Sequence, residues 1–273
     1  MNEKMIQYPF DIIVIAGQSN AEGNALLTPG KSYHCDDVLQ MTDDSLTVYG
    51  YGKLDYTTTA GFPIGYASFR KCNYVCTEDF SETFADEYIR CGFLEKGRKL
   101  LIVKAAVGGT GFSLSQWGVG NPLHTRLKDM IDYALSLGSE NRLVAFLWHQ
   151  GEHDAFEQAE LSAGEREKFY YDAFRKTVED LRATYRQSDL PVIAGEMVDD
   201  WANKNKEATS AVERATKEAC ADLGHAAVAS SAGLLSNAQT IEHSPDDIHF
   251  CADAIEELGR RYFALWRQIT GRM

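Results

Sequence analysis

The sequence lacks a long apolar run, an excess of positive charge and a signal peptide. No window of the 273 residues approaches the roughly 20 apolar residues that a membrane-spanning helix needs. The N-terminus lacks a basic region followed by an apolar core and a small-residue cleavage site. The formal net charge of -13 disfavours nucleic-acid binding and gives no support to a polybasic membrane surface. We therefore expect a cytoplasmic protein with no nucleic-acid and no membrane partner, whose oligomeric state is unknown.

Paired cysteines are also missing. The six cysteines, at positions 35, 72, 76, 91, 220 and 251, are scattered and form no CxxC pair. Their spacing therefore indicates neither a disulfide framework nor a zinc ribbon. Reduced thiols are expected. One metal site is conceivable, from His34, Cys35, Cys72 and Cys76, but the irregular spacing argues against it.

The N-terminal stretch DIIVIAGQSNAEGN organises the rest of the chain. Residues 12–16 are apolar and mostly β-branched, which predicts a buried strand, and Gly17, Gln18, Ser19 and Asn20 follow at once as turn formers. Such a strand delivers Ser19 to the carboxyl edge of a sheet, where open α/β sheets bind ligands. A plain strand-to-loop turn is the alternative for this segment taken alone.

Further along, apolar strand patterns alternate with helical ones. Strands are expected at 12–16, 100–107, 143–148, 192–195 and 226–229, and helices from 81 to before 97 and at about 123–138, 165–186, 204–223 and 251–269. Ser81 is the expected N-cap of the first of these helices. Alternation of this kind predicts an α/β fold, a single doubly wound domain over residues 1–273 with a parallel sheet of about five strands.

A region with little periodicity, at about 25–80, interrupts this pattern. It is rich in Gly, Tyr, Thr and Asp, and connections of this length usually serve as functional covers or walls. Five aromatic residues in it could stack on a sugar or form a local core beneath the loop: Tyr49, Tyr51, Tyr56, Phe62 and Tyr66.

Polar clusters follow three of the predicted strands, and a fourth precedes the last helix. They are GQSN at 17–20, GGTG at 108–111, HQGEHD at 149–154 and DDIHF at 246–250. All four would lie at one edge of a parallel sheet, where turns also need glycine and polar residues. Their coincidence at that edge predicts a functional site.

The set GQSN, AAVGGT, WHQGE and DxIHF resembles the SGNH hydrolase superfamily, and within it the carbohydrate acetylesterases of the sialate O-acetylesterase and acetylxylan esterase type. The resemblance extends from Ile12 to Phe250, nearly the whole chain. It implies a serine esterase that removes O-acetyl groups from a carbohydrate through an acyl-enzyme, with no cofactor.

The resemblance also implies residue roles. Ser19 matches the nucleophile, which needs a base to take its proton, and His249 matches that base. Asp246, three residues earlier, would orient the imidazole, although in some acetylesterases of this type the HQGE glutamate, here Glu152, supplies that carboxylate. The alternative for Glu152 is that it anchors its own turn. Asp247 is out of register and is expected to be a solvated loop residue.

The oxyanion hole is expected to contain three donors. They are the backbone N–H of Ser19, a backbone N–H of the Gly108–Gly109 turn, for which we choose Gly109, and the side-chain amide of Gln150. No metal is required, because the proton relay and these donors suffice for acyl transfer.

The substrate is open between acetylated sialic acid and an acetylated xylo- or hexo-oligosaccharide, and no substrate-binding residue is assigned. A sialic acid carboxylate would favour a nearby cation such as Arg70, Lys71 or Arg126, each of which could equally be a surface charge. Two other functions stay open: a lipase-like or thioesterase SGNH hydrolase acting on a non-carbohydrate ester, and a catalytically inactive carbohydrate-binding protein.

Overall fold

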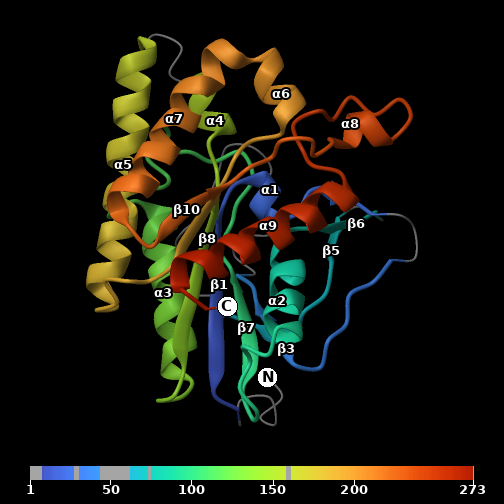
Figure 1. The fold of residues 1–273 in the computed structure, drawn as a ribbon, viewed down its shortest axis with the longest axis vertical. Coiled ribbons are helices and arrows are strands. Elements are labelled where there is room, and N and C mark those ends of the chain that lie inside the picture. Colours follow the sequence, from blue (N-terminus) through green and yellow to red (C-terminus); the bar gives the residue numbers. More distant parts are fainter. Residues whose placement is uncertain (1–7, 28–30, 44–61, 73–74, 158–160, 273) are drawn as a thin grey trace.

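A computed structural model describes residues 8–27, 31–43, 62–72, 75–157 and 161–272. Its centre is a seven-stranded sheet in the order β10-β9-β8-β1-β7-β3-β4 (Figure 1). The strands are β10 (Ala226–Ala229), β9 (Val192–Gly195), β8 (Arg142–His149), β1 (Phe10–Gly17), β7 (Lys99–Lys104), β3 (Val38–Met41) and β4 (Ile64–Tyr66). All neighbours pair in parallel except β3 and β4. The α/β prediction is confirmed.

The five expected strands are all present, and β3 and β4 extend the sheet beyond the number expected. Both come from the region predicted to be loop-rich. That region also contributes to a separate antiparallel sheet of β2 (Ala25–Leu26), β6 (Val75–Glu78) and β5 (Arg70–Cys72). Except for the two-residue β2, each of these short strands is interrupted by a polar residue or glycine, so none shows the apolar run seen at 192–194 or 226–229.

β1 is the central strand of the sheet, between β8 and β7, and every one of its residues is buried. Even Asp11 is fully buried, and it is compensated at the amino end of the sheet by hydrogen bonds from Arg98, Arg142 and Tyr88. At the other end, Gly17 of β1 pairs with His149 of β8. The residues that follow these two strands therefore begin side by side.

Helices cover both faces of the sheet (Figure 1). Successive side chains of β8 point to opposite faces: Trp148 contacts Phe174 of α5, whereas His149 hydrogen-bonds Tyr262 of α9. The helices are α1 (Ser19–Glu22), α2 (Ser81–Arg90), α3 (Pro122–Ser136), α4 (Glu152–Glu157), α5 (Ala163–Thr184), α6 (Asp199–Lys204), α7 (Lys206–Leu223), α8 (Asn237–Thr240) and α9 (Ala252–Thr270). No helix within the described ranges is long and apolar enough to cross a membrane.

The expected cap of α2 is wrong by one residue. Ser81 is the first helical residue, and its N–H donates to the Asp79 carboxylate at 2.7 Å. Asp79 therefore satisfies the first helical donor in place of a serine cap.

Two earlier hypotheses fall partly outside the described residues. Tyr49, Tyr51 and Tyr56 lie outside them, as do the side chains of Cys72 and Cys76. The Phe62 ring is tilted against the Tyr133 ring, with the ring centroids 5.6 Å apart, which favours the local-core alternative for Phe62. Among the side chains that are described, no group of three or more His, Cys, Asp or Glu could hold a metal ion.

Candidate catalytic site

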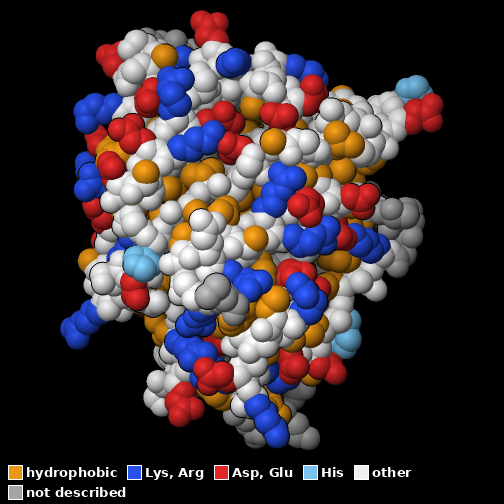
Figure 2. Space-filling model, viewed as in Figure 1, with side chains coloured by type: hydrophobic (Ala, Val, Ile, Leu, Met, Phe, Trp, Pro, Cys, Tyr) orange, Lys and Arg blue, Asp and Glu red, His pale blue; other side chains and the backbone are white. Residues whose placement is uncertain are grey.

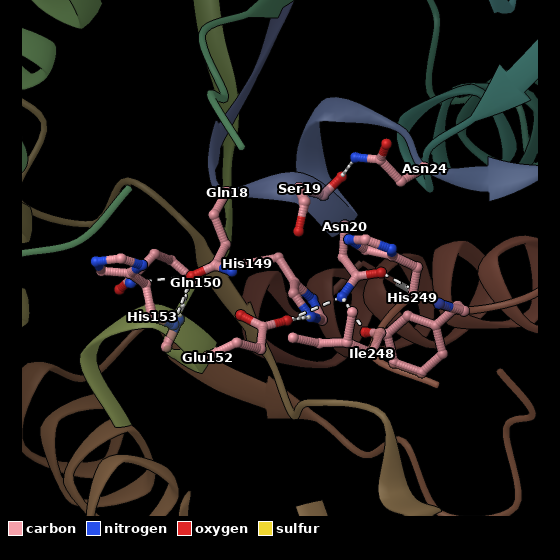
Figure 3. Close-up of polar contacts among 12 residues, drawn as sticks. Gln18, Ser19, Asn20, Asn24, His149, Gln150, Glu152, His153, Ile248 and His249 are labelled. Atoms are coloured by element: carbon pink, nitrogen blue, oxygen red, sulfur yellow. Dashed lines mark hydrogen bonds and ion pairs between the residues drawn. The ribbon is translucent and has the colours of Figure 1, made fainter. Parts of the chain in front are cut away.

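The polar clusters meet at the carboxyl edge of the sheet, as expected. The turns after β1, β7 and β8 are joined by backbone hydrogen bonds, from Gln18 to the His149 carbonyl at 2.9 Å and from Val107 to the Gly17 carbonyl at 3.0 Å. The loop before α9 reaches the same place, because the Asn20 amide donates to the Ile248 carbonyl at 3.1 Å (Figure 3). Asn20 follows Ser19 in the chain and Ile248 precedes His249. The hydrogen bond between Asn20 and Ile248 therefore brings the Ser19 and His249 segments together.

Ser19 begins α1 at this edge. Its carbonyl accepts from the Asn24 amide at 2.7 Å and from Gly23 N–H at 3.0 Å, which fixes the backbone of the turn. The residue is only partly buried, and its hydroxyl hydrogen-bonds to none of the described residues. The serine oxygen is therefore available for chemistry, on a backbone that is held in place.

The Gly108 turn lies directly against Ser19. A Cβ at position 108 would come within 3.5 Å of the Ser19 Cβ and 2.7 Å of the Glu22 carboxylate. Gly108 N–H donates to that carboxylate at 2.8 Å, so this N–H is already used. The next residue, Gly109, has a φ of +68° and an N–H for which no acceptor is found among the described residues. A left-handed backbone of this kind favours glycine.

His249 is held by Asp246. Its Nδ1 lies 2.8 Å from Asp246 Oδ1, and its backbone N–H also donates to that oxygen at 3.3 Å. The second Asp246 oxygen accepts from the buried Asn237 amide at 2.8 Å. Burial raises the pKa of Asp246, but the hydrogen bonds from His249 and Asn237 outweigh it, and the pKa lies below its usual value. The carboxylate is therefore charged at neutral pH.

Glu152 makes no hydrogen bond to His249. Its Oε1 accepts from the Asn20 amide at 2.8 Å, and its Oε2 is buried with no partner among the described residues. Burial raises its pKa above the usual value, so the neutral form is favoured relative to an exposed glutamate. Of the two candidate carboxylates, the one in contact with His249 is Asp246.

His149 lies beside Glu152 and, unlike His249, has no carboxylate among the described residues as a hydrogen-bond partner. It is buried, its Nδ1 lies 3.1 Å from the Tyr262 hydroxyl, and its Nε2 lies 3.8 Å from Glu152 Oε1. Burial lowers the pKa of His149 to about 3. This neutral histidine packs between Phe80 and Phe250 and belongs to the structural support of the site.

The Gln150 amide is held by internal partners. Its Nε2 lies within hydrogen-bonding distance of Asp154 at 2.8 Å, the Thr110 carbonyl at 3.1 Å and Gln18 Oε1 at 3.2 Å, and Tyr170 donates to its Oε1 at 2.9 Å. Its role as an oxyanion donor stays a prediction, to which the structure adds a condition. One of these bonds must be given up when the oxyanion forms.

Four supporting residues were not singled out from the sequence. Asn20 and Asp154 belong to the GQSN and HQGEHD clusters, so these motifs could have pointed to them. Glu22 and Asn237 lie outside the four polar clusters. Asp154 accepts from the backbone N–H groups of Phe112 at 2.9 Å and of the next residue at 2.7 Å, and so shapes the loop after Gly109. Such contacts depend on tertiary structure that local patterns do not encode.

Of the three cations considered for substrate binding, only Arg126 has a side chain that the structure describes. Arg126 donates to the buried Asp43 at 2.9 Å and lies over the Phe62 ring. The side chains of Arg70 and Lys71 are outside the described set. Asp247 forms an ion pair with Lys204 at 3.2 Å, which fits a loop residue facing solvent.

Comparison with known families identifies the family of the chain. Residues 9–268 match the model of a family described as carbohydrate esterase, sialic acid-specific acetylesterase. The chain belongs to this family. It is therefore a carboxylic ester hydrolase for O-acetyl groups on carbohydrates, which confirms the family resemblance and the reaction class expected from the sequence.

Three solved structures share the fold over nearly the whole of this chain. NanS aligns with a TM-score of 0.75 at 18% identity, over 97% of this chain and 98% of NanS. A protein from Arabidopsis thaliana aligns at 0.69 and 16% identity, over 95% and 98%. A carbohydrate acetylesterase from Xanthomonas citri aligns at 0.59 and 16% identity, over 96% and 57%. At this identity the likeness shows the fold alone. No curated protein matches the sequence significantly.

Proposed function

We propose that Ser19, His249 and Asp246 form the catalytic triad of this carbohydrate O-acetylesterase. The observation that carries the proposal is the 2.8 Å contact between His249 Nδ1 and Asp246, on a loop bonded directly to the residue after Ser19. With Nδ1 protonated and held by a charged carboxylate, Nε2 is the basic nitrogen. A serine hydroxyl needs such a base to become nucleophilic at neutral pH.

The reaction then proceeds in two steps. His249 Nε2 takes the Ser19 proton while Oγ attacks the acetyl carbonyl, and the proton passes to the sugar oxygen as the ester C–O bond breaks. The acetyl group remains on Ser19. Water, deprotonated by His249, attacks this acyl-enzyme and releases acetate, and the proton returns to Ser19. The proton transfers and bond changes of both steps require no metal or other cofactor.

The oxyanion of each tetrahedral intermediate requires preorganised donors. We place the backbone N–H groups of Ser19 and Gly109 in this role, since neither has an acceptor among the described residues. The Gln150 amide is the third donor if it releases one of its internal bonds. A donor set from two adjoining turns would approach the same oxygen from two directions.

The proposal leaves open which acetylated sugar is the substrate. The family description favours an acetylated sialic acid, whereas an acetylated xylo- or hexo-oligosaccharide needs no partner for a carboxylate. The test is acetate release by the purified protein from acetylated sialic acid, acetylated xylo-oligosaccharide, acetylated hexose, and 4-nitrophenyl esters from acetyl to octanoyl. Release from one sugar, with acetyl preferred among the simple esters, would name the substrate. Preference for long acyl chains would contradict the proposal.

Location in the cytoplasm, expected from the sequence, is retained as a proposal. Cys35, Cys91, Cys220 and Cys251 are all free thiols in the structure, as a reducing compartment favours. Detection of the protein in a cell fraction other than the cytoplasm would reject it.

A further inference from the structure

Two buried asparagines connect the segments that carry Ser19 and His249. The first segment is residues 17–26 and the second is residues 246–250, more than two hundred positions apart in the chain. Asn20 and Asn237 are exposed to 1% and 0%, so their amides contribute through contacts inside the protein. Neither has been given a role in the reaction proposed above.

Asn20 connects the two segments next to His249. Its Nδ2 donates to the Ile248 carbonyl at 3.1 Å and to Glu152 at 2.8 Å, and its Oδ1 accepts from Phe250 N–H at 3.2 Å (Figure 3). The residues before and after His249 are therefore both bonded to the residue after Ser19. Glu152 fixes the orientation of the amide that makes these contacts.

Asn237 connects the same segments through Asp246. Its Nδ2 donates to Asp246 Oδ2 at 2.8 Å and to the Asn24 carbonyl at 3.1 Å, and its Oδ1 accepts from Leu26 N–H at 3.2 Å. The Asn24 side chain in turn donates to the Ser19 carbonyl at 2.7 Å. A continuous series of hydrogen bonds thus runs from the Ser19 backbone to the carboxylate that holds His249.

An amide suits this task because it offers two donors and an acceptor in one plane. Both asparagines use all of these on partners from different segments, where water has little access. Removing one leaves buried backbone groups unpaired and the two segments free to shift. Displacement of reacting groups by about 1 Å can cost roughly a hundredfold in rate.

We propose that Asn20 and Asn237 are positioning residues, which hold the His249 loop against the Ser19 turn as two amide bridges. The inference rests on the proposed triad. It adds that the relative position of nucleophile and base is set by these side chains rather than by the sheet alone.

The kinetic test uses Asn20→Ala and Asn237→Ala with 4-nitrophenyl acetate. Each variant should lose about tenfold to a hundredfold in kcat, with KM changed by less than about twofold, because both side chains are buried and do not face a bound substrate. The matched control is Asn141→Ala. The Asn141 amide also joins two segments, accepting from Phe10 N–H at 2.8 Å and donating to the Ala134 carbonyl at 2.8 Å, but at the opposite end of the sheet.

A spectroscopic readout separates positioning from general destabilisation. The His249 Nδ1 proton, shared with Asp246, should give a low-field ¹H NMR resonance that disappears in Asp246→Ala. It should shift or broaden in Asn20→Ala and Asn237→Ala and stay in place in Asn141→Ala. If Asn237→Ala does not fold, Asn237→Ser is the second variant, because its shorter hydroxyl side chain cannot make all three contacts to Asp246, Asn24 and Leu26 and adds no charge beside Asp246.

The outcomes are distinguishable from failure of the proposed function. A wild-type protein without esterase activity would reject the triad, while the resonance would still report whether the bridges hold His249. An unchanged resonance and unchanged kcat in both bridge variants would overturn the inference. So would equal kinetic losses in Asn141→Ala.

Discussion

Asp246 and Glu152 are both close to the His249 loop, but in different surroundings. Asp246 is partly exposed and accepts from His249 and Asn237, and its pKa is lowered. Glu152 is buried, accepts one side-chain hydrogen bond from Asn20, and burial raises its pKa. The sequence left both residues open as partners of His249, because either motif position can supply a carboxylate. Only the folded positions of the side chains distinguish them.

At Gln150, substitution by alanine should lower kcat by about a hundredfold, because a side-chain oxyanion donor contributes that much to transition-state stabilisation. KM should change little. Steady-state acetate release measures both constants. An effect confined to KM would place Gln150 in substrate binding instead.

The matched control for Gln150→Ala is Gln187→Ala. The Gln187 amide donates to the Leu143 carbonyl at 3.2 Å, at the amino end of the same strand β8. Gln187→Ala therefore removes an amide contact with the same strand, at the end away from Ser19. Its kcat should equal that of the wild type.

His149 should make folding stability depend on pH. Its folded pKa of about 3 is below the ordinary value of 6.5. Between these values the unfolded chain binds a proton that the folded protein does not, so the free energy of unfolding falls as pH falls. At about 1.4 kcal/mol per pH unit, the loss from pH 6.5 to 4.5 is about 2 to 3 kcal/mol.

Urea unfolding at about pH 7 and pH 4.5, for the wild type and His149→Gln, measures this contribution. Glu152 and the other carboxylates are present in both proteins, so the difference between the two pH dependences reports His149. The variant should lose less stability on acidification. Equal losses would contradict a buried neutral histidine.

At the scale of elements, the strands that build the site were predictable and the bridges between their turns were not. The strands β1, β7 and β8 follow from continuous apolar runs, which parallel strands buried on both faces require. The edge strand β4 and its neighbour β3 are interrupted by Gly65 and Gln40, so neither gives such a run. Asn237 gave no signal, since a single asparagine at the start of a short helix is common.

The Gly108–Gly109 turn gives a test at this scale. Gly109→Ala should cost about 1 to 2 kcal/mol of stability, because its φ of +68° is unfavourable for alanine. The N–H should also shift, and kcat should fall at least about tenfold. Thermal unfolding and acetate release measure the two effects.

Gly92→Ala is the control for that backbone strain. Gly92 has a φ of +77°, and an added Cβ there would meet no atom within 4 Å. Stability should fall by a similar amount, with no change in kcat. A comparable kinetic loss in Gly92→Ala would show that the effect at Gly109 is general destabilisation.

At the scale of the molecule, one hydrophobic core cluster contains residues from β1 through α9, including Ile13, Phe146 and Trp266. This favours the expected single domain, whose signature would be one cooperative unfolding transition. The face in Figure 2 carries Lys and Arg interspersed with Asp and Glu. The alternation of strand and helix patterns predicted the α/β class, and the composition showed the acidic balance. The position of the loop before α9 beside Ser19 depends on the whole fold.

The most direct test of the central claim compares acetate release by the wild type and Ser19→Ala from the acetylated sugar that the substrate panel identifies. Ser19→Ala should lose about a thousandfold or more in kcat. Its unfolding midpoint should be unchanged, because the hydroxyl has no hydrogen-bond partner among the described residues. Turnover by Ser19→Ala at the wild-type rate would contradict the account, since the acyl-enzyme could not then form on Ser19.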